Sequence, residues 1–381
     1  MSVPQRLNLT REERDARLAG DARLTRGLGA TYVRGHTGAF PRVSMSEIGE
    51  HAEEGDVWVR VVQDAGLEAV MMVSPWPANR TANHTARYFP DDLAAYEAYV
   101  RALVERYDGD GVDDAPGLRA PVRYWEVDNE PDLKFTNPPR GAVRDVEPGT
   151  FCKPDEYARV LVASARAIRA AYPDAKVLGA GLYRPHAESG VDYLRALAGE
   201  PGVRDALDVL SLHTYADDDG GRLAAGIRNA RGVLPDLPVW VTETSAPGED
   251  EAQQARRVVA LAARAAVEGA ERLFWHTLAD PPARAKGGGP EGLRTHSLFR
   301  ASDDGSLAEK PAAATFRHLA AVLGEHDLAG AVDAGPGVVR LRDGSRLLYA
   351  GTAAGPGVDL RDGTSIPAGE TAEAPAFLVK E

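Results

Sequence analysis

Seven short apolar runs recur along this chain, and longer stretches with a helical period separate them. Runs rich in Val, Leu and aromatic residues are typical of buried strands. Strands that alternate with helices build a parallel sheet with crossover connections, so the pattern predicts consecutive βα units. The seven runs span residues 30–34, 68–74, 122–128, 175–181, 207–213, 238–243 and 272–277.

This pattern predicts an α/β fold of the (β/α)8 TIM barrel type, with its first strand short or missing. The missing strand belongs before the first helix, where only SVPQRLNL (2–9) is available and RLNL could supply a stub. Either the barrel closes imperfectly there, or the sequence begins downstream of the natural start. A doubly wound open sheet is the alternative. However, no strand in this chain is followed by a G-x-G-x-x-G turn, the motif with which that fold usually binds dinucleotides.

Helix starts and turn signals give the chain its further divisions. Thr10 and Glu13 have the spacing of a capping box, which predicts a helix that begins near residue 11. From residue 327 the pattern changes to short strands with Asp-Gly pairs, which favour hairpins. We therefore predict a barrel over residues 1–326 and a small β-strand domain over residues 327–381.

Charge and cysteine content exclude several classes of function. The net charge of −13 has the wrong sign for binding nucleic acid or an anionic membrane, so a neutral substrate fits better. Cys152 is the single cysteine, which excludes an intramolecular disulfide and a thiolate metal site. No apolar run is long enough to span a membrane, and the N-terminus lacks the apolar core of a signal peptide. We expect a cytoplasmic protein, or a secreted one if the N-terminus is truncated.

Two predicted strands run directly into carboxylates. The segment VRYWEVDNE (122–130) is halted by Pro131, and PVWVTETS (238–245) carries Glu243 between two threonines. In barrels the C-terminal ends of the strands form the active site, which places Asn129 and Glu130 at the mouth. Two carboxyl groups on separate strand ends are what glycoside cleavage requires, one as an acid and one as a nucleophile.

Four motifs occur in order at these strand ends, namely NEP (129–131), LHTY (212–215), TE (242–243) and FW (274–275). Together they resemble glycoside hydrolase clan A, the retaining (β/α)8 glycosidases. With YVRGH (32–36), EVDNEPD (126–132) and the KPA that opens the last helix, the chain is most similar to glycoside hydrolase family 39, which includes β-xylosidases and α-L-iduronidases. That family usually has tryptophan where this chain has Asp128.

The resemblance implies a role for each matching residue. Glu130 resembles the general acid/base, Glu243 the nucleophile, and Asn129 the residue that binds the sugar 2-hydroxyl. Arg34 would stabilise the nucleophile from below, and Tyr215 would donate a hydrogen bond to it. The implied sugar-binding side chains are His36, His213, Trp275 as a stacking floor, and Trp76 as a further platform.

Each of these residues also has a plainer interpretation. Glu130 could cap a helix, and Arg34 could simply neutralise Glu126 or Asp128 inside the barrel. Single histidines and tryptophans in barrels are often core residues. For the whole chain, the alternative from another class is a catalytically silent barrel that binds carbohydrate.

Rival enzyme classes lack their motifs here. The histidines form no H-x-H or H-x-x-x-H pair, and no G-x-S-x-G turn is present for a serine hydrolase. No metal and no organic cofactor is implied. The expected partner is a carbohydrate substrate, held by subsites that depend on the loops 74–90, 131–153, 183–192, 215–222 and 279–297.

Overall fold

The computed structural model describes residues 10–35, 48–75, 89–90, 92–136, 148–215, 219–247, 250–279, 296–302, 304–324, 326 and 328–380. Seven parallel strands form one sheet, and their order in space follows their order in the chain. They are β1 (Tyr32–Arg34), β2 (Glu68–Val73), β3 (Tyr124–Val127), β4 (Lys176–Leu182), β5 (Val209–Tyr215), β6 (Val239–Ser245) and β7 (Arg272–Trp275). All seven predicted strands are confirmed, and the sequential order rules out a doubly wound sheet, in which the order reverses.

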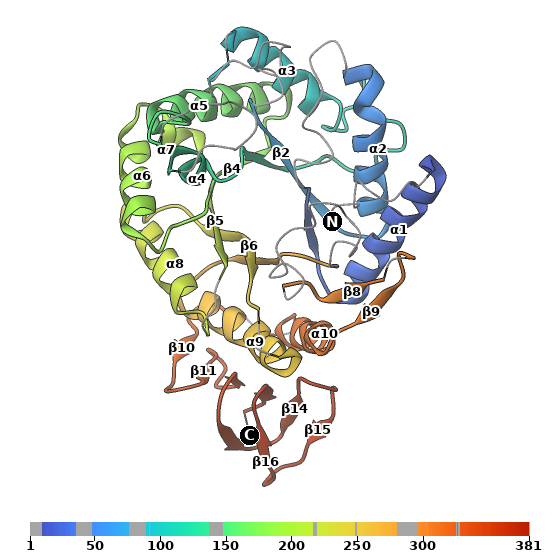
Figure 1. Ribbon diagram of the computed structural model, residues 1–381, viewed down its shortest axis with the longest axis vertical. Helices are drawn as coiled ribbons and strands as arrows, with labels where there is room; N and C mark the ends of the chain where they lie inside the picture. The colour runs from blue at the N-terminus through green and yellow to red at the C-terminus, as the bar shows by residue number, and fades with distance from the viewer. Residues whose placement is uncertain are drawn as a thin grey trace.

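Helices surround these strands as an outer ring (Figure 1). They are α1 (Arg11–Gly27), α2 (Ile48–Asp64), α3 (Leu93–Glu105), α4 (Pro131–Thr136), α5 (Pro154–Ala171), α6 (Glu188–Gly199), α7 (Val203–Ala206), α8 (Gly221–Val233), α9 (Glu251–Val267) and α10 (Pro311–Leu323). The capping box is confirmed, since the Thr10 side chain accepts from the Glu13 N–H and the Glu13 carboxylate accepts from the Thr10 N–H. The architecture is that of a (β/α)8 barrel. Helix α4 lies inside the segment 131–153, which was expected to be a loop.

Among the described residues, no strand pairs with both β1 and β7 to close the barrel. These two strands are the edges of the sheet, and a cavity of about 500 Å³ lies against both of them, bounded also by α9, α10 and the end of α1. Leu273, Phe274 and Trp275 of β7 are only half-buried, whereas the central strands are buried almost throughout. The described residues therefore contain the predicted gap of one strand, and residues 1–9 lie outside them.

The inside of the barrel changes from aromatic to polar along the strands. Tyr32, Tyr124, Trp240 and Phe274 contact one another in one layer, with ring centroids 5.0–6.2 Å apart. Side chains two residues apart on a strand point to the same face. The next inward positions towards the C-terminal ends are Arg34, Glu126, Thr242 and His276. An aromatic floor thus supports a layer of charged and polar groups.

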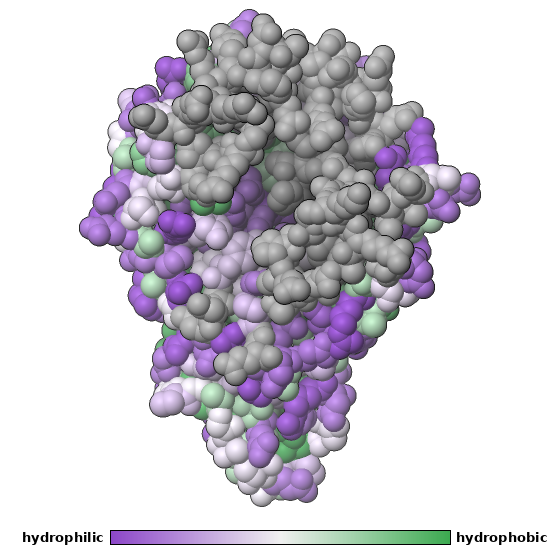
Figure 2. Space-filling model, viewed as in Figure 1, coloured by the Kyte–Doolittle hydropathy of each residue, from purple (hydrophilic) through white to green (hydrophobic). Residues whose placement is uncertain are grey.

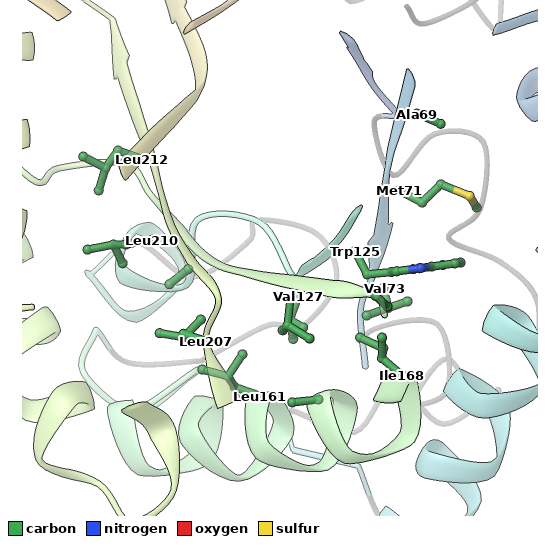
Figure 3. Close-up of a cluster of buried hydrophobic side chains, with 14 of the residues drawn as sticks. Ala69, Met71, Val73, Trp125, Val127, Leu161, Ile168, Leu207, Leu210 and Leu212 are labelled. Atoms are coloured by element: carbon green, nitrogen blue, oxygen red, sulfur yellow. The ribbon is translucent and has the colours of Figure 1, made fainter. Parts of the chain in front are cut away.

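Apolar contacts between the sheet and the helices hold the barrel together. Figure 3 shows Leu161 and Ile168 of α5 packed beside Val127 of β3 and Leu207 and Leu210 on the β5 side. All five side chains are buried and belong to the same cluster. None of the described helices is both long enough and apolar enough to cross a lipid bilayer.

The C-terminal strands form a separate sheet of six strands in the order β10-β11-β12-β17-β14-β15, beside a two-stranded pair of β13 and β16. Their bounds are β10 (Val332–Asp333), β11 (Val338–Arg340), β12 (Arg346–Leu348), β13 (Thr352–Ala354), β14 (Gly357–Asp359), β15 (Ser365–Ile366), β16 (Thr371–Glu373) and β17 (Ala376–Leu378). Both predicted Asp-Gly hairpins are present, as the antiparallel pairs β11–β12 and β14–β15. An unpredicted hairpin of β8 (Phe299–Ala301) and β9 (Leu307–Glu309) precedes α10.

The C-terminal sheet lies against α9 and α10 and projects below the barrel in Figures 1 and 2. Figure 2 shows that its described surface is a mixture of hydrophilic and hydrophobic residues. Among the described residues, the large hydrophobic side chains that are exposed are Val112, Val332 and Val379. The proposed boundary at residue 326 stays a prediction.

Candidate active site

Two glutamates meet at the C-terminal end of the barrel. Glu130 follows β3 directly before α4, and Glu243 lies within β6. Carboxylate oxygens of the two residues and a ring nitrogen of His213 all lie within 4.8 Å of one another. Glu243 is buried, while the Glu130 side chain is 16% exposed. The two carboxyl groups therefore face one another in a site from which most water is excluded.

The backbone turns sharply between β3 and α4. Asp128 and Glu130 have φ angles of 64° and 52°, a left-handed conformation that costs energy for residues with a side chain. The buried Asp128 carboxylate holds this turn, because Ser74 Oγ and Lys134 Nζ donate to its Oδ1 at 2.9 and 2.6 Å. The acidic side chains that end this strand thus include one that anchors the turn and one that faces the site.

Asp132 anchors the other side of the same turn. Its carboxylate accepts hydrogen bonds from the backbone N–H groups of Tyr183 and Arg184, at 2.8 and 2.9 Å. Burial raises the pKa of the Asp132 carboxyl, and those two N–H groups oppose that shift. These bonds tie the start of α4 to the end of β4.

Arg34 connects the two strands that carry the glutamates. Its Nε donates to Glu126 Oε2, its Nη1 donates to Glu243 Oε1, and its Nη2 donates to Asn129 Oδ1 at 2.8 Å. Both Arg34 and Glu126 are buried. Of the two interpretations left open by the sequence, both hold in part, because Arg34 pairs with Glu126 as well as with Glu243.

Two residues of β5 bind the pair from a third side. His213 Nδ1 lies 2.9 Å from Glu130 Oε1 and 3.8 Å from Glu243 Oε2, and Tyr215 donates its hydroxyl proton to Glu243 Oε2. Burial and the adjacent Glu243 charge raise the pKa of Tyr215, so its hydroxyl stays a donor. Burial alone would lower the pKa of His213, but the charge of Glu243 and the contact with Glu130 raise it.

A tryptophan and two histidines complete the wall next to Tyr215. His276 and His296 stand edge-on to the Tyr215 ring, with centroids 5.8 and 5.9 Å away. Trp275 is half-buried, and its Nε1 donates to the backbone oxygen of His296 at 2.9 Å. Ser245 Oγ lies 2.7 Å from His296 Nδ1. Burial lowers the pKa of His276 and lowers that of His296 to about 4, so both rings are neutral at pH 7.

The structure thus brings together most of the side chains that the sequence indicated. They are Arg34, Asn129, Glu130, His213, Tyr215, Glu243 and Trp275. His36 and Trp76 lie outside the described residues.

The sequence interpretation assigned no site role to four residues of this network. Glu126 was considered only as a possible partner of Arg34, although it is two residues from Tyr124 and four from Glu130 on a strand whose alternate positions face inward. Thr242 lies within the TE motif, and His276 directly follows the FW motif. His296 follows a Gly-rich sequence and had no local signal.

The set of Glu130, His213 and Glu243 contains the ligand types that a divalent metal ion uses. Two features disfavour this use. His213 Nδ1 is already within hydrogen-bonding distance of Glu130, and the Arg34 guanidinium occupies one oxygen of Glu243 with a positive charge. The donor set therefore suits carboxylate chemistry better than cation binding.

One known protein family matches part of this chain. The model of glycoside hydrolase family 44 matches residues 30–187, the part of the chain that carries Arg34 and Glu130. A search of curated proteins finds no match. The family that matches differs from family 39, to which the sequence motifs are most similar.

Several solved structures with a similar fold are described as glycosidases. A family 39 glycoside hydrolase from Bacteroides cellulosilyticus is 16% identical, with a TM-score of 0.62, over 95% of this chain and 76% of that one. A monomeric β-xylosidase from Caulobacter crescentus is 19% identical, with a TM-score of 0.58, over 89% and 71%. A family 1 β-glucosidase from Thermotoga maritima is 13% identical, with a TM-score of 0.59, over 81% and 87%. At these identities the likeness establishes the barrel fold.

Proposed function

We infer that this chain is a retaining glycoside hydrolase of the clan A type, which cleaves an O-glycosidic bond by double displacement. The observation that carries this inference is the approach of Glu130 and Glu243 to within 4.8 Å. Retaining enzymes hold their two carboxyl groups about 5–5.5 Å apart, whereas inverting enzymes leave about 6.5–9.5 Å for a water molecule.

The surroundings of the two carboxyl groups support different roles for them. Glu243 receives hydrogen bonds from Arg34 and Tyr215, donors that favour an ionised carboxylate. Glu130 contacts His213, is more exposed, and lies at the mouth, where a leaving group would enter and depart. We therefore assign Glu243 as the nucleophile and Glu130 as the acid/base.

In the first step, an oxygen of Glu243 forms an ester bond to the anomeric carbon. The bond from that carbon to the leaving oxygen breaks, its electron pair stays with that oxygen, and Glu130 supplies the proton. In the second step, Glu130 takes a proton from water, the water oxygen attacks the anomeric carbon, and the ester electrons return to Glu243. The anomeric configuration is retained because each step inverts it.

The remaining side chains are assigned to substrate binding. Asn129, held by Arg34, would bind the 2-hydroxyl, and Trp275 offers a half-buried indole for an apolar sugar face. The substrate class is a glycoside, oligosaccharide or polysaccharide. Because the similar structures include a β-xylosidase and a β-glucosidase, xylosides and glucosides are the first compounds to test.

The test is labelling of the nucleophile. The protein is incubated with activated 2-deoxy-2-fluoro xylosides, glucosides, mannosides and galactosides, and then analysed by intact mass spectrometry and peptide mapping. We expect a stable adduct on Glu243, which would identify the nucleophile, retention and the preferred sugar together. An adduct elsewhere, or none on a folded protein that hydrolyses the same sugars, would refute the assignment.

The alternative of a silent carbohydrate-binding barrel predicts a different result. A silent binder would show sugar affinity but no hydrolysis in the wild type. Glu130→Ala and Glu243→Ala would then have no hydrolysis to abolish. An enzyme loses hydrolysis in both variants. Azide can restore turnover of an activated glycoside in either variant, but the products differ. Glu130→Ala, whose nucleophile is intact, should give a glycosyl azide of retained configuration, and Glu243→Ala should give one of inverted configuration. The opposite pattern would exchange the two roles.

A further inference from the structure

A third carboxylate lies beneath the catalytic pair, and neither step of the double displacement uses it. Glu126 is on β3, four residues before Glu130, and has no exposed surface. Its Oε2 accepts from Arg34 Nε, and its Oε1 accepts from Thr242 Oγ1 at 2.9 Å. All of its described partners are therefore on the inner face of the barrel, below the reacting atoms.

We propose that Glu126 is a positioning residue that remains paired with Arg34 throughout the reaction and thereby controls how readily Glu243 attacks the sugar. This inference rests on the proposed function of Glu243 as nucleophile. Glu126 acts through Arg34 and does not touch the substrate.

The argument begins with the charge of Arg34. One guanidinium serves two carboxylates, with Nε on Glu126 and Nη1 on Glu243. Its side chain is only 6% exposed. A buried cation that loses its partner is strongly destabilising, because nothing else replaces the water it has given up.

Formation of the glycosyl-enzyme removes one of those partners. When an oxygen of Glu243 becomes part of an ester, its negative charge disappears from the site. Glu126 takes no part in that bond, so Arg34 stays paired with it in the covalent intermediate. The first step is therefore less costly with Glu126 present than it would be with a neutral side chain in its place.

The same arrangement affects Glu243 before the reaction. The titratable and charged groups around it are Arg34 from β1, Glu126 and Glu130 from β3 and its end, His213 and Tyr215 from β5, and His276 directly after β7. Glu126 is the like charge in this set that neither meets the sugar nor exchanges a proton in the mechanism. Because it shares Arg34, Glu243 keeps more of its basicity than it would if it held Arg34 alone.

The test is Glu126→Gln, which keeps the size and removes the charge. A 2,4-dinitrophenyl glycoside of the sugar that labels Glu243 is used, and burst kinetics separate formation of the intermediate from its hydrolysis. We expect formation to slow about tenfold or more and hydrolysis not to slow. We also expect the acidic limb of the kcat/KM profile to move down by about one pH unit or more, the effect of a nearby charge.

Two further variants keep the charge and serve as controls. Glu126→Asp should leave the acidic limb where it is. Thr242→Val removes the hydrogen bond on Glu126 Oε1 and strengthens the pull of Glu126 on Arg34, so the limb should move up. That sign tests the proposal even if Glu126→Gln does not fold.

Several results would overturn the inference. A folded Glu126→Gln protein that slows both steps equally, or keeps the wild-type acidic limb, would show a merely structural role. A downward shift in Thr242→Val would do the same. Absence of both labelling and turnover in the wild type would instead refute the proposed function. The wild type is therefore assayed before any variant.

Discussion

At the residue scale, the wall beside Tyr215 contains two neutral histidines, His276 and His296. His296 is held by Ser245 through its side chain and by Trp275 through its backbone oxygen. Burial lowers the pKa of His296, and the neighbouring His276 and Lys310 lower it further, to about 4.

This shift makes a prediction about stability. In the unfolded chain His296 binds its proton with a pKa of about 6.5. Between that pH and pH 4 the unfolded state therefore binds more protons than the folded state, and stability falls as the pH is lowered through this window. We expect His296→Asn to reduce the loss of Tm between pH 6.5 and pH 4, as measured by calorimetry. An unchanged or steeper pH dependence in the variant would contradict this.

At the element scale, the connection from β3 to α4 decides where Glu130 lies. Two residues with positive φ would not hold this path by themselves. Asp128 contributes by binding Ser74 and Lys134, and Asp132 contributes by binding two N–H groups beyond β4. The turn therefore depends on both its backbone conformation and its acidic anchors, and substitutions can separate the two.

We expect Asp128→Ala to lower the free energy of unfolding by about 2–4 kcal/mol, because it removes a buried carboxylate that binds both Lys134 and Ser74. Asp128→Gly removes the same contacts but accepts the left-handed backbone. It should be more stable than Asp128→Ala by about 1 kcal/mol, the cost of that conformation for a residue with Cβ. Urea titration of the two proteins measures the difference, and alanine as the more stable variant would refute the role of the backbone.

The elements that the sequence predicted share one property, a signal that lies within a few neighbouring residues. The strand runs and the Thr10 capping box depend on neighbouring residues, and both were confirmed. Helix α4 has six residues, too few to show a period. The strands of the β8–β9 hairpin have three residues each, too few to show an alternation. The pairing of Arg34 with both Glu126 and Glu243 depends on the barrel bringing distant strands together, which no local pattern contains.

At the scale of the whole molecule, the C-terminal sheet covers the outer faces of helices that close the barrel. One buried cluster contains Val258 and Val259 of α9 together with Val339, Leu347 and Phe377 of the C-terminal sheet. Arg264 of α9 also pairs with Asp333 at 2.8 Å. On their other side, α9 and α10 border the cavity between β1 and β7. Helices α9 and α10, which border this cavity, therefore also pack against the C-terminal sheet.

A substitution in that sheet should consequently weaken the barrel. Leu347 is 1% exposed, and we expect Leu347→Ala to lower the free energy of unfolding by about 2–4 kcal/mol. All five tryptophans precede residue 327, so their fluorescence reports the barrel alone. If the two parts unfold together, the tryptophan transition moves to lower denaturant, and the free energy of unfolding fitted to it falls by about 2–4 kcal/mol.

Val332→Ala is the control, at a 43% exposed position of the same sheet. It should change that free energy of unfolding by less than about 0.5 kcal/mol. An unchanged tryptophan transition in Leu347→Ala, with circular dichroism showing earlier loss of the strands, would mean that the barrel is stable without its C-terminal sheet.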